Sequence, residues 1–137
     1  MTKQKPVVRT FETGATRDLD ENKLDYEGFL SPLALDAYAR YMSGKRKMAD
    51  GSYRSSDNWQ KGIPLDAYMK SGYRHLMDWW KHHRGLGDLA VEGLEETLCA
   101  IIFNAQGYLH ELLVAKRQRA ERREAVVSAE PTLLHLD

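Results

Sequence analysis

The sequence has one cysteine, four prolines and no excess of charge of either sign in its 137 residues. The single cysteine, Cys99, excludes a disulfide framework and lies in an apolar run, where a free thiol acts as a small hydrophobic group. Basic and acidic residues balance at 20 each, so no whole-molecule field attracts nucleic acid or a membrane. No apolar run reaches membrane-spanning length and the N-terminus lacks a signal-peptide core, so we expect a cytoplasmic chain.

Motifs for phosphate loops and for nucleophilic catalysis are also missing. Neither G-x-x-x-x-G-K-[ST] nor G-x-G-x-x-G occurs. No Ser-His-Asp or Cys-His arrangement is suggested, and the adjacent His82 and His83 cannot share one helix face as a zinc pair. Any phosphate contact must therefore come from basic side chains. The candidates are Arg17, Lys23, Lys61 and Arg74.

Three helices account for most of the remaining pattern. Ser31-Pro32 is a strong helix start, and the first helix is expected to end near Gly44. Pro64 opens the second, whose periodic part covers 68–83 before a Gly-rich turn. The third is expected to run from about Val91 to Glu124.

These elements predict one all-α domain over residues 1–124. Residues 1–29 show no sustained period and are expected to form an extended arm and loops, and 125–137 a flexible tail. The last two helices are apolar over more than one face, and three helices cannot bury both. We therefore predict a helical bundle completed by homo-oligomerisation, as a dimer or tetramer.

Acidic and imidazole groups lie one turn apart on the last two helices. His75 and Asp78 are three residues apart and share a face. Glu92, Glu95 and Glu96 begin the third helix, and an antiparallel pair would bring Asp78 near them. One interpretation is a site for Mg²⁺ or Mn²⁺. The other is that the glutamates only complement the positive end of their helix.

Three further features have a structural and a functional interpretation. Asn104 lies within an apolar helix, where a buried amide either bonds a neighbouring helix or reads a base in a pocket with tryptophan. Trp59 lies in a polar loop and either packs on the core or faces a flat ligand. The basic run 116–123 is interleaved with Glu121 and lacks aromatic residues. We therefore interpret it as a solvated helix end and not as a nucleic-acid-binding site.

Several segments together resemble a phage-associated family, the dATP/dGTP diphosphohydrolase N-terminal family. Its MazZ-type members resemble compact relatives of the all-α MazG nucleotide pyrophosphohydrolases. The resemblance covers roughly residues 11 to 114. The segments that carry it, in order, are Phe11-Glu12-Thr13-Gly14-Ala15-Thr16-Arg17-Asp18, Lys23-Leu24-Asp25-Tyr26-Glu27, Ser56-Asp57-Asn58-Trp59-Gln60-Lys61-Gly62, Tyr73-Arg74-His75 and Leu98-Cys99-Ala100-Ile101-Ile102-Phe103-Asn104-Ala105.

The resemblance implies hydrolysis of a purine (d)NTP, most of all dGTP, to the monophosphate and pyrophosphate with Mg²⁺ or Mn²⁺. In phages that replace adenine by 2-aminoadenine, this reaction would supply dGMP. MazG-type enzymes hold metal with E-x-x-E and E-x-x-D, whereas this sequence carries His75-x-x-Asp78 and Glu92-x-x-Glu95. The implied roles are catalysis for His75, Asp78 and Glu96; metal binding for Asp78, Glu92, Glu95, Glu96 and Asp25; and substrate binding for Arg17, Lys23, Asn58, Trp59, Lys61, Arg74 and Asn104.

Two alternatives belong to other classes of function. The incomplete acid motifs and the basic end of the third helix are compatible with a non-catalytic, phage-encoded interaction module. A pyrophosphohydrolase that prefers another nucleotide, such as dATP or dUTP, is the second.

Overall fold

A computed structural model describes residues 7–19 and 22–130 of the chain. Backbone contacts divide the chain into two compact units, Met1–Leu33 and Ala34–Asp137. Each unit is described below by itself.

The first unit contains a small antiparallel hairpin. Strands β1 (Val7–Thr10) and β2 (Thr16–Leu19) pair with Val7 opposite Leu19 and Thr10 opposite Thr16. Gly14, with φ of 83°, supplies the left-handed turn residue between them. The sequence predicted an extended arm and loops here, and it did not predict that two parts of the arm would pair as strands. The short helix α1 (Tyr26–Phe29) follows, capped by the Asp25 carboxylate at 2.8 Å from the Gly28 amide.

Helix α2 (Pro32–Gly44) begins and ends as the sequence predicts. The following segment turns back on itself through an isolated bridge between Lys47 and Tyr53. Asp50 closes the tip by accepting bonds from the Ser52 amide and hydroxyl, at 3.0 and 2.6 Å. The short 3₁₀ helix η1 (Asn58–Lys61) then leads to α3.

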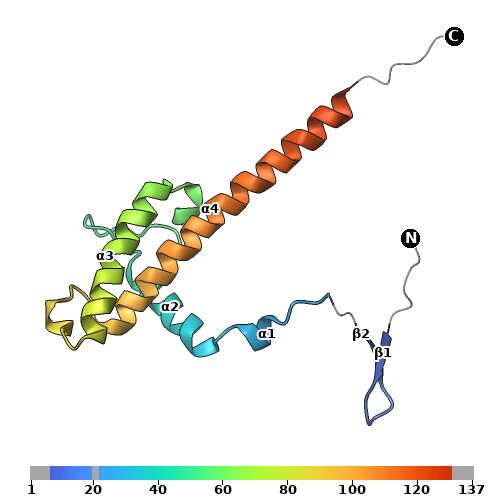
Figure 1. Cartoon of the computed structure of the whole chain (residues 1–137), viewed down its shortest axis with the longest axis horizontal. Coiled ribbons are helices and arrows are strands. Elements are labelled where there is room, and N and C mark those ends of the chain that lie inside the picture. The colour runs from blue at the N-terminus through green and yellow to red at the C-terminus, as the bar shows by residue number, and fades with distance from the viewer. Residues whose placement is uncertain (1–6, 20–21, 131–137) are drawn as a thin grey trace. The chain divides into compact units, whose positions relative to one another are not determined.

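Helices α3 (Leu65–His83) and α4 (Leu94–Ala129) pack side by side in antiparallel directions and form the centre of the second unit (Figure 1). Gly85, with φ of 73°, ends α3, and the 3₁₀ helix η2 (Gly87–Leu89) completes the turn. The predicted Gly-rich turn is confirmed. The tail boundary was wrong, because α4 continues to Ala129; residues 131–137 lie outside the described part.

Small residues on α4 let it approach α3 closely. Tyr68, 2% exposed, packs its ring edge-on to Phe103 with centroids 5.8 Å apart. A Cβ on Gly107 would collide with the Tyr68 ring, so glycine is required at that crossing. Gly72 and Asn104 make the next crossing toward the turn, where a Cβ on Gly72 would lie 3.7 Å from the Asn104 Cβ. The order of these contacts fixes the antiparallel register.

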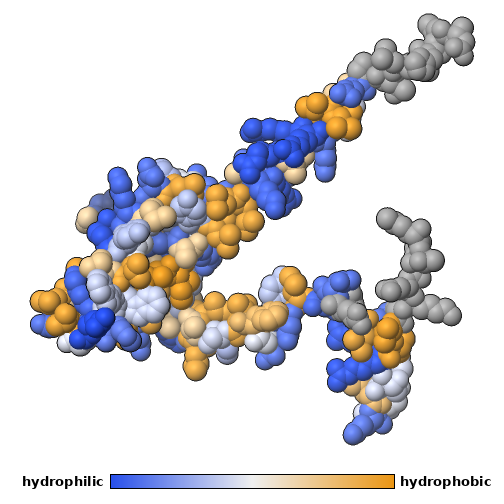
Figure 2. Space-filling model, viewed as in Figure 1, coloured by the Kyte–Doolittle hydropathy of each residue, from blue (hydrophilic) through white to orange (hydrophobic). Residues whose placement is uncertain are grey.

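Few apolar side chains are buried among the described residues. The buried hydrophobic residues are Tyr68, Cys99 and Ala100, while large apolar side chains along α3 and α4 stay exposed (Figure 2). By length and composition alone α4 could also cross a membrane, with 22% of its most apolar window buried in the chain. The fold is mostly helical, which confirms the all-α class in outline, with the hairpin as its departure.

Candidate functional site

A cavity of about 580 Å³ lies within the second unit. Its wall combines the end of α2, the segment that follows it, η1, the middle of α3 and the first turns of α4. Its volume falls in the range usual for small-molecule sites. The side chains that bear on its chemistry are Tyr41, Lys45, Arg46, Arg54, Ser55, Ser56, Asn58, Trp59, Ser71, His75, Glu92, Phe103 and Asn104.

Two arginines of the wall, Arg46 and Arg54, are joined by hydrogen bonds that involve their backbone groups. The Arg54 amide donates to the Arg46 carbonyl at 2.9 Å, and the Arg46 Nε donates to the Arg54 carbonyl at 2.9 Å. This reciprocal pair, the arginine clip, fixes the segment after α2 as a rigid loop. The exposed Arg54 guanidinium forms no hydrogen bond or ion pair among the described residues. It is therefore available for an anionic ligand.

Glu92 is the acidic residue in the described wall, which also contains the cations Lys45, Arg46 and Arg54. Lys45 Nζ lies 2.9 Å from its Oε1, and the Tyr41 hydroxyl donates to its Oε2 at 3.4 Å. Burial and then the charge of Glu92 raise the pKa of Tyr41 to about 12. Glu92 thus neutralises one cation, and the two guanidinium groups leave the wall with positive charge.

The wall also supplies an aromatic ring and two amides. Trp59, on η1, meets the His110 ring edge-on at 4.7 Å. Asn104 is 6% exposed, and its Nδ2 donates to the Ala100 carbonyl at 2.8 Å. This bond is made within α4 itself, so it is not the bond to a neighbouring helix that the structural interpretation predicted, and Asn104 lies in the cavity wall, where the functional interpretation requires it. Asn58, half-buried, completes this polar corner.

His75 reaches the cavity from the middle of α3. Its Nδ1 is enclosed and has no hydrogen-bond partner among the residues that the structure describes. An imidazole ring can accept or donate one proton, and this nitrogen has no partner that occupies it. Of the residues predicted for a site, the structure brings five to this cavity: Asn58, Trp59, His75, Glu92 and Asn104.

Asp78, one turn further along α3, is 5% exposed and already engaged. Its Oδ2 accepts from the Val91 amide and its Oδ1 from Lys81 Nζ, both at 3.3 Å. Burial raises the pKa of Asp78, but these two contacts outweigh it and leave the pKa below its ordinary value. The carboxylate therefore fastens the turn to α3, and it lies outside the described cavity wall.

Glu95 and Glu96 lie in the first turn of α4, whose N-cap is Gly93. The Glu96 carboxylate folds back so closely that a Cβ on Gly93 would lie 2.5 Å from it. Acidic groups in this place complement the helix dipole. The structural interpretation of the glutamates therefore fits better than the ligand interpretation.

The described residues do not gather the acidic groups that the sequence suggested as metal ligands. Among residues 7–19 and 22–130, no three His, Cys, Asp or Glu side chains are placed to hold one ion. Asp78 and Glu92 each have a cation partner instead. The described donors thus do not fit a resident Mg²⁺ or Mn²⁺.

The other predicted residues lie elsewhere. Lys61 and Arg74 are exposed and outside the described cavity wall. Arg17 on β2, Lys23, and Asp25 at the start of α1 belong to the first unit. Asp25 caps its own helix.

The arginine clip and Lys45 were missed as site residues. Lys45, Arg46 and Arg54 are not among the residues that the sequence analysis predicted for a site. A signal was present, since Arg54-Ser55-Ser56 puts a guanidinium beside two hydroxyls just before the aromatic and amide pair at 58–59.

Comparisons of the chain with protein-family models, with curated proteins and with solved structures found no match. The chemistry of the cavity itself therefore carries the functional assignment.

Proposed function

We propose that the cavity binds a purine nucleoside triphosphate, most of all dGTP, and that the protein hydrolyses it to the monophosphate and pyrophosphate. The observation that carries this proposal is the arginine clip, with a free guanidinium, facing the same cavity as Trp59 and two amides. Positive charge at one part and a flat ring with amides at another suit a ligand with a polyphosphate and a base.

The polyphosphate is assigned to the basic part of the wall. Arg54 and Arg46 offer planar donors that pair with phosphate oxygens in two-pronged fashion. Lys45, paired to Glu92 at 2.9 Å, adds a third cation that can turn toward phosphate. The hydroxyls of Ser55 and Ser56 are further donors in the same wall.

The base is assigned to the corner of Trp59, Asn58 and Asn104. An amide presents both a donor and an acceptor, which is what the edge of a purine requires. The indole ring offers a face for stacking. Because Asn104 is 6% exposed, a base edge that failed to bond it would leave a buried polar group unpaired, which favours the matching base.

Hydrolysis needs a water oriented toward the α-phosphorus. In the proposed step, the water oxygen bonds to that phosphorus as its bond to the bridging oxygen breaks. The bridging oxygen leaves with pyrophosphate, its charge stabilised by the guanidinium groups. His75, whose side chain lies in the cavity wall, accepts the proton that the water loses.

Mg²⁺ or Mn²⁺ enters this proposal as the counter-ion that accompanies a triphosphate, neutralising phosphate charge. In the part of the chain that the structure describes, no three such ligand groups are clustered for it.

A second candidate is a non-catalytic module that binds the nucleotide. It is favoured by that same lack of a three-ligand cluster among the described residues. Its cavity contacts would be those given above, without the transfer of a proton to His75.

Two measurements separate these candidates. Calorimetric titration of dGTP, dATP, dUTP and pyrophosphate measures binding, and pyrophosphate release with Mg²⁺, Mn²⁺ or chelator measures turnover. We expect binding and release, with dGTP preferred. Binding without release supports the non-catalytic module, and absence of binding by a folded sample refutes both.

A further inference from the structure

The second half of α4 continues beyond the part that packs on α3. Figure 1 shows α4 extending well past the start of α3, and every residue of 116–130 is exposed. Burial therefore does not hold this part in helical form. Its arginine, glutamate, glutamine and alanine residues favour a helix, and it extends a helix already formed, which avoids the cost of nucleation. Its charged side chains are consequently presented on defined faces.

The charged segment of this extension, residues 116–124, has two different faces. Successive residues lie about 100° apart around a helix. Arg117, Glu121 and Glu124 therefore share one face, where Arg117 Nε lies 3.1 Å from Glu121 Oε1. Four cations share roughly one third of the circumference elsewhere, with no acidic residue of the charged segment among them. These four, the basic face, are Lys116, Arg119, Arg122 and Arg123.

The cations of the basic face have no protein partner among residues 7–19 and 22–130. All four are exposed, and none takes part in an ion pair or a side-chain hydrogen bond there. In the sequence Glu121 interrupts the basic run, but on the helix it pairs with Arg117 on the other face. The reason for interpreting the run as a solvated helix end therefore holds for Arg117 and not for the basic face.

Duplex DNA is the partner that this face fits. Guanidinium groups pair with phosphate oxygens through two parallel donors, and B-DNA carries one negative charge per ~1.7 Å of its axis. A helix about 10–12 Å across with its side chains matches a major groove about 12 Å wide. The major groove of duplex RNA is deep and narrow and fits such a helix less well.

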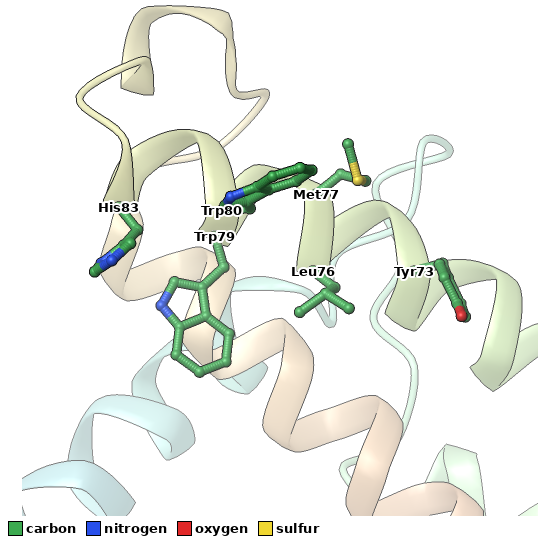
Figure 3. Close-up of a pocket in the computed structure, with 6 residues that line it drawn as sticks. All are labelled: Tyr73, Leu76, Met77, Trp79, Trp80 and His83. Carbon is green, nitrogen blue, oxygen red and sulfur yellow. The ribbon is translucent and has the colours of Figure 1, made fainter.

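A lipid surface suits the charged segment less well. An interfacial helix needs large apolar side chains opposite its charges, whereas the uncharged residues here are Gln118 and Ala120, followed before the helix ends by two valines. Large apolar rings of this unit lie on α3 instead. Figure 3 shows Trp79 and Trp80 near the end of α3, from which α4 runs roughly six turns before it reaches Lys116.

We propose that the basic face of α4 binds the phosphate backbone of duplex DNA along its major groove, without reading base sequence. The contact is electrostatic and releases the counter-ions that DNA holds. The basic face lies outside the described cavity wall. The proposal therefore does not depend on what the cavity binds.

The full-length chain and a short labelled DNA duplex of mixed sequence test the proposal. Fluorescence anisotropy measures the dissociation constant at a series of salt concentrations. With four phosphate contacts, affinity should fall roughly 100-fold between about 50 and about 200 mM salt. A duplex of different sequence should bind equally, because phosphate contacts carry no sequence information. A folded chain that binds neither duplex at about 50 mM salt, or that strongly prefers one of them, overturns the proposal.

Variants matched in charge test whether one face of the helix carries the binding. Arg122→Gln and Arg117→Gln each remove one positive charge, the first from the basic face and the second from the opposite face. We expect Arg122→Gln to weaken DNA binding several-fold and Arg117→Gln to leave it nearly unchanged. With Arg119→Gln added to Arg122→Gln, the loss between about 50 and about 200 mM salt should shrink to roughly tenfold. Arg54→Ala, in the cavity wall, should bind DNA like the wild type.

Each contrary outcome overturns a different part of the proposal. Equal weakening by Arg117→Gln and Arg122→Gln would show that net charge, and not the basic face, attracts DNA. Weakening by Arg54→Ala alone would place the DNA at the cavity. Tighter binding to duplex RNA, to phosphatidylserine vesicles or to polyaspartate than to duplex DNA would assign the face to that other partner.

A charge-retaining variant separates electrostatic loss from damage to the helix. The substituted side chains are exposed, and glutamine and lysine are both strong helix formers, so circular dichroism should be unchanged. Arg119→Lys combined with Arg122→Lys should keep the salt dependence of the wild type. If the lysine variant loses it as the glutamine variant does, the contact is not the electrostatic one proposed.

Discussion

Polar groups near the turn between α3 and α4 have bonding partners, whereas some polar groups near the middle of this helix pair do not. At the turn, Asp78 is held by Lys81 and the Val91 amide. One turn earlier along α3, His75 lies in a cavity wall and has a ring nitrogen without a partner among the described residues, and the Arg54 guanidinium in the same wall also lacks a partner among them. Groups whose bonds are complete stabilise the fold, whereas groups left open are the ones that can act on a ligand. The acidic residues whose spacing suggested a metal site belong to the groups that stabilise the fold.

Replacing His75 is the strongest test of this comparison. His75→Gln keeps a polar side chain of similar size but cannot take a proton. We expect nucleotide affinity to be retained and turnover to fall roughly 100- to 10,000-fold, the usual range for a lost general base. Single-turnover pyrophosphate release measures it. Unchanged turnover would remove His75 from the mechanism and leave the cavity as a binding site.

Arg54→Ala removes the free cation without touching the backbone bonds of the clip. Loss of a charged hydrogen bond to phosphate should weaken nucleotide binding by ~10- to 100-fold, with little change in melting temperature. Titration calorimetry gives the affinity. Arg74→Ala, exposed and outside the described wall, is the matched control; an equal loss in both variants contradicts a specific phosphate contact.

Gly107→Ala tests the packing that supports the cavity. The new Cβ would meet the Tyr68 ring, and such overpacking costs about 1–3 kcal/mol of unfolding free energy. Urea unfolding monitors the change. Gly44→Ala, where a Cβ has nothing within 4 Å, should be neutral or slightly stabilising. A similar loss at both positions would mean that the crossing is not tight.

Asp78→Asn tests the turn end. The folded-state pKa of Asp78 is lowered, so its carboxylate stabilises the fold above the ordinary value of 3.8 and that stability is lost as pH falls below it. We expect a modest drop in urea midpoint at neutral pH that vanishes in acid, with nucleotide affinity unaltered. A variant that folds normally but loses nucleotide-dependent turnover would return Asp78 to the catalytic site.

Glu92→Gln makes the smallest expected change. It removes the charge that helps raise the pKa of Tyr41 to about 12, while the burial that contributes most remains. The pKa should fall toward 10.0 without reaching it, as site-resolved NMR of the tyrosine ring would show. Since a raised pKa favours the neutral folded state, wild-type stability should decline between pH 10.0 and 12. An unchanged pKa would mean that Glu92 does not contact Tyr41 in solution.

The sequence predicted the helices well because their signals are local. Pro32 and Pro64 set two starts, and Gly85 ended α3. It missed the hairpin, whose four-residue strands are too short and too exposed to show a clear alternation. It also ended α4 at Glu124, whereas the uncharged segment 125–129 continues the helix.

The candidate site was predicted in part. Asn58, Trp59, His75, Glu92 and Asn104 were named, and they share one cavity. Asp78, Glu95 and Glu96 have the right spacing for ligands, but spacing does not reveal that a backbone amide or a helix end already occupies a carboxylate. Arg46 and Arg54 could be placed only once the intervening loop folded back.

The sequence by itself thus determined an all-α core, its capping and the apolar stripes, because these follow from residue period and local backbone preference. Only the tertiary structure decided which polar groups form bonds within the fold and which have no partner among the described residues. That choice depends on long-range contacts, such as Lys45 with Glu92 at 2.9 Å and Val91 with Asp78 at 3.3 Å. No local sequence pattern predicts these contacts, because each joins residues that are far apart in the sequence.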